Sequence, residues 1–495
     1  MESIFSLASF AAGAEVLFSP YGMALLVLGV VLGIAIGATP GLSPSMGVAL
    51  LVPMSYGMEP AYAFAFFVAV YQAANYGGSL TAITLNAPGT PSAVVTALDG
   101  YKMTTQGKGG EALGYAVIAS SLGGLFGGIV LMLFAIPLAG FGLQFGPHEY
   151  FALALFGLST VIGFSGGKWK KTFIAVLFGL LLATIGTDTF TGEERFTLGF
   201  FELYDGFSFI PVMIGLFALA EIFSRLEEMV LSSENEVPII EDTGLGFFRS
   251  IGRFKKTLFQ SSLIGTLIGI VPGAGATIAS FISYGQAKRS STKSDSFGEG
   301  SPEGIVASEA ANSSSVGGAL IPLLSLGIPG SATDAVLLGA MSMHGLVAGP
   351  ELFQTAPEIV YGIFLAVILA NFAIFFFGYF GSRLWLKVAD VRESYLFPVI
   401  FALCLLGSFT IRNSLFDCWT CLLFGFVGWL FRKYDYQAAP IVLGLVLGDM
   451  IETNLRRAFL MGDSTQFFTR PLCLFFLVCA VLLFLSPLRP SRYSK

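Results

Sequence analysis

The sequence predicts an all-α polytopic membrane protein. Of its 495 residues, 55% are hydrophobic and only 12% are charged. Soluble domains carry about 25% charged residues, so the composition excludes an ordinary soluble protein. The apolar segments are long and do not alternate with polar residues, which favours membrane helices over a membrane barrel. The chain has no dense basic patch, so we expect no nucleic-acid partner.

A charged stretch divides the apolar segments into two sets. The segments before it are residues 21–36, 42–55, 61–76, 79–98, 112–137, 149–165, 172–187 and 207–224, and those after it are 257–271, 274–284, 304–340 (interrupted), 359–381, 394–411, 415–431, 437–451 and 472–488. We therefore predict a first repeat over residues 1–224, a cytoplasmic linker over 225–256 and a second repeat over 257–495.

Four Pro-Gly pairs interrupt these apolar segments at corresponding places. Pro40-Gly41 and Pro88-Gly89 lie in the first half, and Pro272-Gly273 and Pro329-Gly330 lie in the second. The offsets between equivalent prolines are similar, 232 and 241 residues. Interrupted helices leave backbone groups free at membrane depth, which is tolerated only where they are buried or line a cavity. The pattern is typical of transporters that contain an internal repeat.

The basic residues indicate that the two repeats have opposite orientations. In the first half, residues 56–60 contain no Lys or Arg, whereas the loop after the second interruption contains Lys102 and Lys108. In the second half the order is reversed: basic residues follow the first interruption at 288–293, and residues 344–358 contain none. Cytoplasmic loops collect Lys and Arg. We therefore predict an inverted-topology repeat, with the N-terminus periplasmic and the C-terminus cytoplasmic.

Two features constrain the topology further. An odd number of crossings must separate residues 56–60 from 99–110, so at least one of the segments 61–76 and 79–98 must be re-entrant or half-length. Arg456 and Arg457 do not fit the charge rule, because a full crossing at 437–451 places them outside. Either that segment re-enters without crossing, or the two arginines have a role on the outer side.

The interruptions are the candidate substrate site. A helix that begins at Thr90 or Ser331 would present free N–H groups and a partial positive charge, which could hold a carboxylate without a buried Lys or Arg. A fixed charge at the bilayer centre would cost at least ~2.5–3.5 kcal/mol. The predicted substrate-binding residues are Pro40, Gly41, Ser43, Asn86, Pro88, Gly89, Thr90, Pro272, Gly273, Gly275, Pro329, Gly330 and Ser331.

Oxygen-bearing side chains near the same interruptions are candidates for a small-cation site. Carbonyl, hydroxyl and amide oxygens suit hard cations. The predicted cation ligands are Asn75, Ser79, Thr81, Asn312, Ser314, Thr333 and Asp334. For Asp334 and for the nearby Glu309, helix capping and cation coordination both stay open. Asp99 is interpreted as a helix end that meets a cytoplasmic loop.

The motifs around these residues resemble one known family, the large membrane subunit (TctA-like) of the tripartite tricarboxylate transporter family. The resemblance covers nearly the whole chain. It is carried by residues 37–42, 46–53, 76–82, 99–101, 272–280, 302–311, 326–334 and 440–448, together with Glu452 and 455–457. One departure is Ser313, where many members of that family have Asn, which affects the expected cation ligands.

The resemblance implies a secondary transporter of the bacterial inner membrane that imports carboxylates with a sodium or proton gradient. Its implied partners are a small membrane subunit (TctB-like) and a periplasmic solute-binding protein (TctC-like) that delivers the substrate. No cofactor is expected; the coupling ion would be Na⁺, with H⁺ as the alternative. The architecture expected with it is a transport core that moves past a scaffold, as in an elevator.

Two other functions are weighed against this one. An anion channel could use similar helix interruptions in a filter. A membrane-embedded enzyme is the other alternative, but the sequence has no HExxH motif and no GxGD motif. Uptake that requires an ion gradient would exclude a channel, and product formation by the purified chain would favour an enzyme.

Overall fold

In the part of the chain that the structure describes, the fold is helical apart from one very short β-hairpin. The computed structural model describes residues 7–39, 41–165, 167–231, 251–382, 384–385, 393–462 and 465–488. The helices of the first half are α1 Leu7–Phe18, α2 Pro20–Ala38, α3 Pro44–Leu51, α4 Pro60–Leu85, α5 Ala93–Thr105, α6 Gly109–Gly142, α7 Pro147–Gly163, α8 Trp169–Ala183, α9 Phe209–Met213 and α10 Ala220–Leu231. The π-helical segment η3, Ile214–Leu219, joins α9 to α10.

The second half continues the same pattern. Its helices are α12 Lys255–Gly269, α13 Gly275–Ser290, α14 Pro302–Leu326, α15 Ala332–Met343, α16 Leu352–Thr355, α17 Pro357–Phe380, α19 Glu393–Arg412, α20 Leu415–Lys433, α21 Ala438–Leu460, α22 Gln466–Thr469 and α23 Pro471–Leu485. Short 3₁₀ turns are η1 Val52–Ser55, η2 Phe201–Leu203, η4 Gly252–Phe254, η5 Ser294–Ser296 and η6 Ser486–Leu488. The strands β1 Gly186–Thr187 and β2 Glu194–Arg195 pair antiparallel, with Gly186 opposite Arg195.

Six of the described helical segments are long and apolar enough to cross a membrane. They are Pro20–Ala38, Gly109–Gly142, Phe209–Glu227, Pro357–Phe380, Leu415–Lys433 and Ala438–Leu460. Together with the shorter apolar helices between them, these spans make the chain a polytopic membrane protein. The prediction of a helical membrane protein is therefore confirmed.

The predicted interruptions correspond to helix ends with matching local conformations. Asn86 ends α4 with a φ of 54°, and Gly327 ends α14 with a φ of 71°, so both C-caps are left-handed. Asn and Gly are the residues that adopt this conformation at least cost. The chain then resumes as α5 and α15. The segments predicted separately at 61–76 and 79–98 are instead one long helix, α4, followed by the short helix α5.

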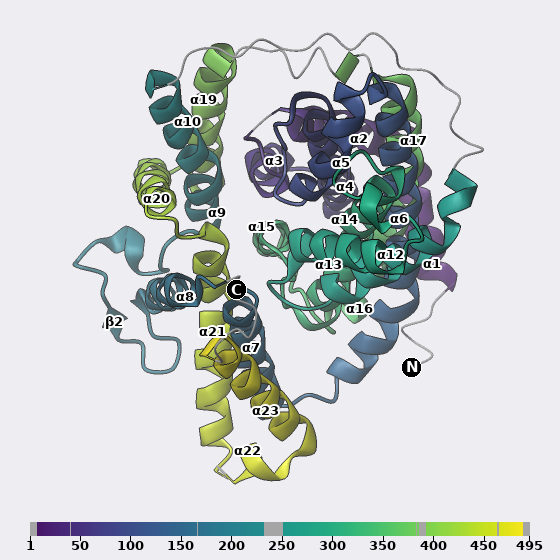
Figure 1. Ribbon diagram of the computed structural model, residues 1–495. Coiled ribbons are helices and arrows are strands. Elements are labelled where there is room, and N and C mark those ends of the chain that lie inside the picture. Colours follow the sequence, from purple (N-terminus) through teal and green to yellow (C-terminus); the bar gives the residue numbers. More distant parts are fainter. Residues whose placement is uncertain are drawn as a thin grey trace.

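The helices form two groups, which Figure 1 shows side by side. The core bundle contains α1–α6 and α12–α17, with α4, α6 and α14 at its centre. The flanking bundle contains α7–α10 and α19–α23. On the core side, α3 and α15 form the interface, where α3 meets η3 and α19, and α15 meets α9 and α21.

The two halves make equivalent helix contacts. The packing of α2 on α4 has its counterpart in α12 on α14, and α6 on α14 corresponds to α17 on α4. Likewise, α5 on α13 corresponds to α15 on α3, and α8 on α21 corresponds to α20 on the α9–α10 segment. In each of these four comparisons, both helices of the first contact are replaced by their equivalents from the other half.

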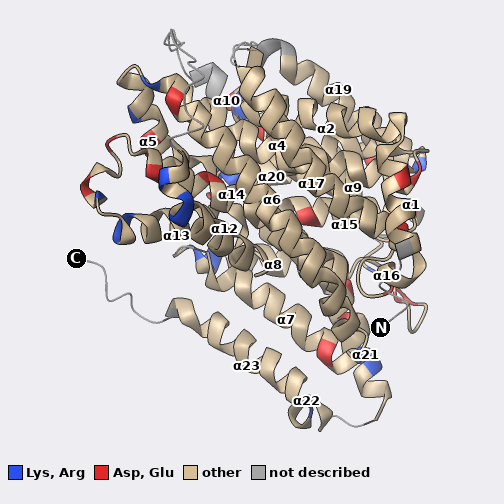
Figure 2. Ribbon diagram, turned by 90° about the vertical axis from the view of Figure 1, so that its right-hand side faces the viewer, with Lys and Arg blue, Asp and Glu red and all other residues tan. Residues whose placement is uncertain are grey.

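Loops from the two halves meet in pairs at the two ends of the core. At one end, Asp99 accepts hydrogen bonds from the backbone N–H groups of Gly298, Gly300 and Ser301 at 2.8–3.0 Å, and Gln106 Nε2 donates to the carbonyl of Glu299 at 3.0 Å. We call this end the α5–α13 face. Figure 2 shows basic residues beside α5 and α13 there.

The opposite end is joined by Ser55 Oγ and His344 Nε2, which are 2.9 Å apart. We call it the α3–α15 face. The helix α4 begins near Ser55 and ends beside Thr104, whose hydroxyl donates to the carbonyl of Ile83 at 2.7 Å. Because its 26 residues span ~39 Å, the two faces lie a membrane thickness apart. Asp99, expected at a helix end that meets a cytoplasmic loop, lies within α5, is fully buried and bonds to a loop of the other half.

The end of α21 accounts for Arg456, one of the two arginines that do not fit the charge rule. The helix is continuous over Ala438–Leu460, so it does not turn back into the membrane after residue 451. Arg456 contacts Asp188 at 2.7 Å and Glu452 at 2.8 Å, so its charge is balanced by the β1–β2 hairpin region. Within the predicted linker, α10 extends to Leu231 and α12 begins at Lys255, and residues 232–250 lie outside the described residues. The domain boundaries stay a prediction.

Candidate functional site

The first-half interruption packs tightly on the helices that precede it. The backbone N–H of Gly89 donates to the carbonyl of Gly78 on α4 at 3.2 Å. A Cβ atom at Gly89 would lie 2.0 Å from the carbonyl oxygen of Gly37 on α2, so only glycine fits there. Thr90 Oγ1 lies 3.1 Å from Ser92 Oγ. The helix α5 begins at Ala93 and not at Thr90, which lies within the interruption.

The tip between α2 and α3 faces the flanking bundle. Pro40 lies outside the described residues. Gly41 has a φ of 88°, and a Cβ atom there would lie 2.7 Å from the guanidinium of Arg225. Arg225 pairs with Glu221 at 3.1 Å, and Glu221 also contacts Arg432. Ser43 caps α3 through the backbone N–H of Met46 at 3.2 Å.

The two interruptions of the second half are bonded directly to each other. The backbone N–H of Gly273, whose φ is 75°, donates to the carbonyl of Gly330 at 2.9 Å. The hydroxyl of Thr160 on α7 donates to the carbonyl of Pro272, which links this pair to the flanking bundle. Gly275, with a φ of 61°, begins α13, and Pro329 lies between the C-cap of α14 and the N-cap of α15.

In both halves the chain runs back into the bundle before the short helix begins. Gly89 lies beside Gly78, which precedes the end of α4 by seven residues, and Gly330 lies beside Ala319, which precedes the end of α14 by seven residues. Seven helical residues span ~10 Å. The helices α5 and α15 therefore begin inside the core, and they run to the α5–α13 face and the α3–α15 face respectively.

The long helices α4 and α14 meet at equivalent positions. Tyr71 precedes Pro88 by 17 residues, and Asn312 precedes Pro329 by 17 residues. The amide of Gln72 donates to the carbonyl of Ser313 at 3.1 Å, and Asn312 Nδ2 donates to the carbonyl of Asn75 at 3.3 Å. The hydroxyl of Tyr71 lies 2.9 Å from that of Ser331, so the centre of α4 reaches the second-half interruption.

The predicted cation ligands divide into separate places. Asn75 and Asn312 meet at the contact between α4 and α14. Ser79 instead donates to Glu309 at 2.6 Å. Thr81 and Ser314 hydrogen-bond within their own helices, to the carbonyls of Gly78 and Ala311. Thr333 and Asp334 lie in the first turn of α15. The structure does not bring the seven together as one site.

Asp334 is a buried carboxylate without a complete set of partners. Its backbone N–H donates to Ser331 Oγ at 3.2 Å, as expected for an N-capped helix. Its side chain is fully buried beside the N–H groups of Gly330 and Ser331, yet both carboxylate oxygens lack a hydrogen bond among the described residues. Buried side-chain oxygens of Gln72 and Asn312 also lack a donor among the described residues. Buried oxygen atoms that accept no hydrogen bond are free to coordinate a small cation, which prefers oxygen ligands.

Comparison with the other buried acids that the structure describes shows that a buried carboxylate without a charged partner or a backbone N–H hydrogen bond is unusual in this protein. Of the described side chains, seven acidic ones are buried: Asp99, Glu149, Asp188, Glu221, Glu309, Asp334 and Asp417. Four of these pair with arginine: Glu149 with Arg470, Asp188 with Arg456, Glu221 with Arg225, and Asp417 with Arg412. Asp99 instead accepts three backbone N–H groups. Among the described buried acids, only Glu309 and Asp334 lack both an arginine partner and a backbone N–H hydrogen bond of good geometry, although the N–H groups of Gly330 and Ser331 lie beside Asp334.

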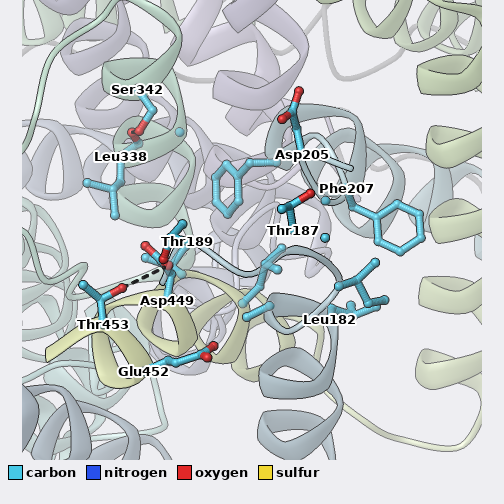
Figure 3. Close-up of a pocket in the computed structure, with 18 of the residues that line it drawn as sticks. Leu182, Thr187, Thr189, Asp205, Phe207, Leu338, Ser342, Asp449, Glu452 and Thr453 are labelled. Atoms are coloured by element: carbon cyan, nitrogen blue, oxygen red, sulfur yellow. Dashed lines mark hydrogen bonds between the residues drawn. The ribbon is translucent and has the colours of Figure 1, made fainter. Parts of the chain in front are cut away.

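A cavity of about 890 Å³ lies where α15 faces the flanking bundle. Its walls are α8, the β1–β2 hairpin region, α15 with the following loop, and α21. Figure 3 shows that Ser342 and Leu338 face it from one side and Asp449, Glu452 and Thr453 from another. It lies at the α3–α15 face, because the loop after α15 lines it.

An ion network closes one side of this cavity. Arg195 contacts Glu452 at 2.6 Å and Asp188 at 3.5 Å, and Arg456 contacts both acids. The backbone N–H of Phe190 and then the Arg456 guanidinium lower the pKa of Asp188 to about 2. The network fixes the hairpin to the end of α21, so the hairpin forms a stable wall.

Several of these residues are missing from the set predicted by sequence. Tyr71 could have been found from its equal spacing with Asn312, and Arg225 was assigned to the linker. Thr160, on α7, carries no local signal, because its role depends on packing against Pro272.

Helices that break inside a bundle, with unpaired buried oxygens beside the breaks, define the class of the protein as a membrane transporter. The particular family follows from comparison with known proteins. The sequence pattern of the tripartite tricarboxylate transporter TctA family matches residues 23–443, and the chain belongs to this family. It is thus a subunit for tricarboxylate transport and not an enzyme, as predicted. The family implies small membrane and solute-binding partner subunits.

Two curated relatives come from Agrobacterium vitis. An uncharacterized 52.8 kDa protein in the TAR-I ttuC' 3' region is 34% identical over 486 residues, which cover 98% of this chain and 96% of the relative. An uncharacterized protein in the TAR-II ttuC' 3' region is 33% identical over 234 residues, which cover 46% of this chain and 97% of the relative. No solved structure matches the fold.

Proposed function

We propose that this chain imports carboxylates by cation-coupled alternating access, and that its two halves form an inverted repeat. The observation that carries the proposal is the pair of helices α5 and α15, which begin inside the core and run to opposite faces. The exchange of equivalent contacts between the halves supports the same symmetry. So does the pairing of loops, since residues 102–108 lie with 293–301 on one face.

Charge orients the protein in the membrane. The α5–α13 face contains Lys102, Lys108, Lys288 and Lys293, so we assign it to the cytoplasm. The α3–α15 face is then periplasmic, as is the N-terminus. The C-terminal residues 489–495 lie outside the described residues, and their basic composition favours the cytoplasm.

The core bundle moves relative to the flanking bundle, which acts as the scaffold. The interface is built from the short helices α3 and α15, and it contains the 890 Å³ cavity. We assign this cavity as the periplasmic vestibule, where a solute-binding protein would deliver its carboxylate. The small membrane subunit would complete the transporter in the bilayer of the inner membrane.

The substrate carboxylate is held by backbone N–H groups at the interruptions. The start of α5 favours this role, because Ser92 provides no side-chain cap. At α15 the first turn already contains Asp334, whose negative charge disfavours a second anion. We therefore place the carboxylate at the first-half interruption and a cation near Asp334, with Na⁺ preferred to H⁺.

Uptake into proteoliposomes tests the proposal. The vesicles contain this chain with its small membrane subunit, and the binding protein is added outside with a labelled carboxylate. We expect accumulation above the external concentration only when an inward Na⁺ or H⁺ gradient is imposed. Uptake that only equilibrates the substrate, with or without the gradient, would indicate a channel and contradict the proposal.

A further inference from the structure

The side chain of Glu309 lies at the centre of a polar cluster in the core. Its carboxylate accepts hydrogen bonds from Ser79 on α4 at 2.6 Å, from Ser120 on α6 at 2.6 Å, and from Thr96 on α5. The side chain is fully buried. Four helices of the core bundle therefore meet at one acidic group.

Among the described residues, no basic side chain joins this cluster to balance the acid. The groups that face it are hydroxyls, with Tyr76 on α4 as the titratable neighbour and Ser308 beside Thr96 at 2.9 Å. Three hydroxyl donors satisfy the hydrogen bonds of a carboxylate, but they do not neutralise its charge. An isolated charge buried in a membrane protein must acquire a cation or a proton. The oxygens present are hard ligands that suit either.

We propose that Glu309 holds an exchangeable monovalent cation, Na⁺ or H⁺, which moves with the core bundle in addition to the cation near Asp334. The inference rests on the proposed function and extends it: each transported carboxylate crosses with at least two cations. The number of cations matters because it sets the net charge that enters with each substrate. A potential of 100 mV, negative inside, lowers the equilibrium accumulation of the substrate about 50-fold for each net negative charge that enters.

The position of Thr96 provides a physical link between this cation and the substrate. Thr96 lies one turn inside α5, which follows the interruption at Pro88 and Gly89. A change in the occupancy of Glu309 changes what the Thr96 hydroxyl contacts, and so shifts the preferred position of α5. The substrate and the cation would then favour the same arrangement of the first-half interruption.

The test uses the substitution Glu309→Gln in the complete transporter. The amide can still accept hydrogen bonds from Ser79 and Thr96 and donate one to Ser120, so the core can retain its packing. Glu303→Gln is the matched control, because Glu303 lies on the same helix and accepts hydrogen bonds from Thr257 and Ser291, both at 2.6 Å, but is only partly buried.

Equilibrium accumulation of the labelled carboxylate is measured in proteoliposomes with equal Na⁺ and pH on both sides and an imposed potential of −100 mV. We expect Glu309→Gln to lower accumulation about 50-fold, the effect of one fewer positive charge, and Glu303→Gln to leave it unchanged. Repeating the experiment with only a Na⁺ gradient or only a pH gradient identifies the cation. Accumulation by Glu309→Gln that equals that of the natural protein overturns the inference.

A second variant keeps the test decisive if Glu309→Gln does not fold. Ser120→Ala retains the carboxylate of Glu309 and removes one of the three hydroxyls that donate hydrogen bonds to it. We expect the cation concentration for half-maximal uptake to change about tenfold, the effect when a charged group loses one hydrogen-bonding partner: it rises if the cation is Na⁺, which loses an oxygen ligand, and falls if the cation is H⁺, because the ionised carboxylate loses a donor. An unchanged value also overturns the inference. If the natural protein needs no cation at all, the proposed function itself is wrong.

Discussion

Substituting Gly89 by alanine tests whether the first-half interruption depends on close backbone contact. In the structure, a Cβ atom at this position would lie 2.0 Å from the carbonyl oxygen of Gly37 and 3.0 Å from the Cα atom of Gly78. Ordinary van der Waals contact begins at 3.4 Å, so the backbones must separate by 3.4 − 2.0, or about 1.4 Å. Neither neighbour is a flexible side chain that could move aside.

The cost should lie at the upper end of the ~1–3 kcal/mol observed for overpacked cores. Because the displaced segment precedes α5, we also expect carboxylate uptake to be lost. Thermal unfolding in detergent and uptake in proteoliposomes measure the two effects. Gly140→Ala is the control: Gly140 lies in α6 with nothing within 4 Å of the added atom, and alanine there should stabilise the helix by ~0.5–1 kcal/mol. If Gly89→Ala matches Gly140→Ala in both measurements, the reasoning is refuted.

Two further substitutions test the cation site and the hairpin. Asp334→Asn removes the carboxylate beside one of the two proposed cations, so accumulation driven by an imposed cation gradient should fall to the level that the single cation at Glu309 can support; accumulation equal to that of the natural protein would exclude Asp334 as a cation ligand. Asp188 has a pKa of about 2, below its usual 3.8, so its stabilising contribution is present above about pH 4 and is lost as the pH falls from 4 towards 2. The protection of the amides of residues 186–207 against hydrogen exchange, relative to the intrinsic rate at each pH, should therefore fall over that range in the natural protein and already be low at pH 6 in Asp188→Asn, and equal profiles would contradict the role of the ion network.

The helix interruptions could be predicted from sequence because their causes are local. Proline cannot continue the hydrogen-bond ladder of a helix, and the Asn and Gly that precede Pro88 and Pro329 favour left-handed C-caps. The half-length element between residues 56 and 99 also followed from charge and parity alone. The starting point of α5 was placed three residues too early, because Thr90 resembles an N-cap.

The grouping of the polar residues could not be predicted, because it depends on how helices cross. Ser79 and Asn75 are four residues apart on one helix, yet the Ser79 hydroxyl donates to Glu309, whereas Asn75 accepts the Asn312 amide at its backbone carbonyl. The pairing of Arg456 with Asp188 joins residues 268 apart in the chain, and no local pattern signals it. The contrast between acids with and without an arginine became visible only when all the buried acids could be compared.

The most direct test of the central claim is the sidedness of four exposed loop positions. Single cysteines at Gln106, Glu299, Tyr56 and Val347 are introduced after the five native cysteines have been replaced, and each variant is labelled with a membrane-impermeant maleimide. We predict that Gln106 and Glu299 react only from the cytoplasmic side and that Tyr56 and Val347 react only from the periplasmic side. Reaction of Gln106 and Glu299 from different sides would contradict the inverted arrangement of the two halves.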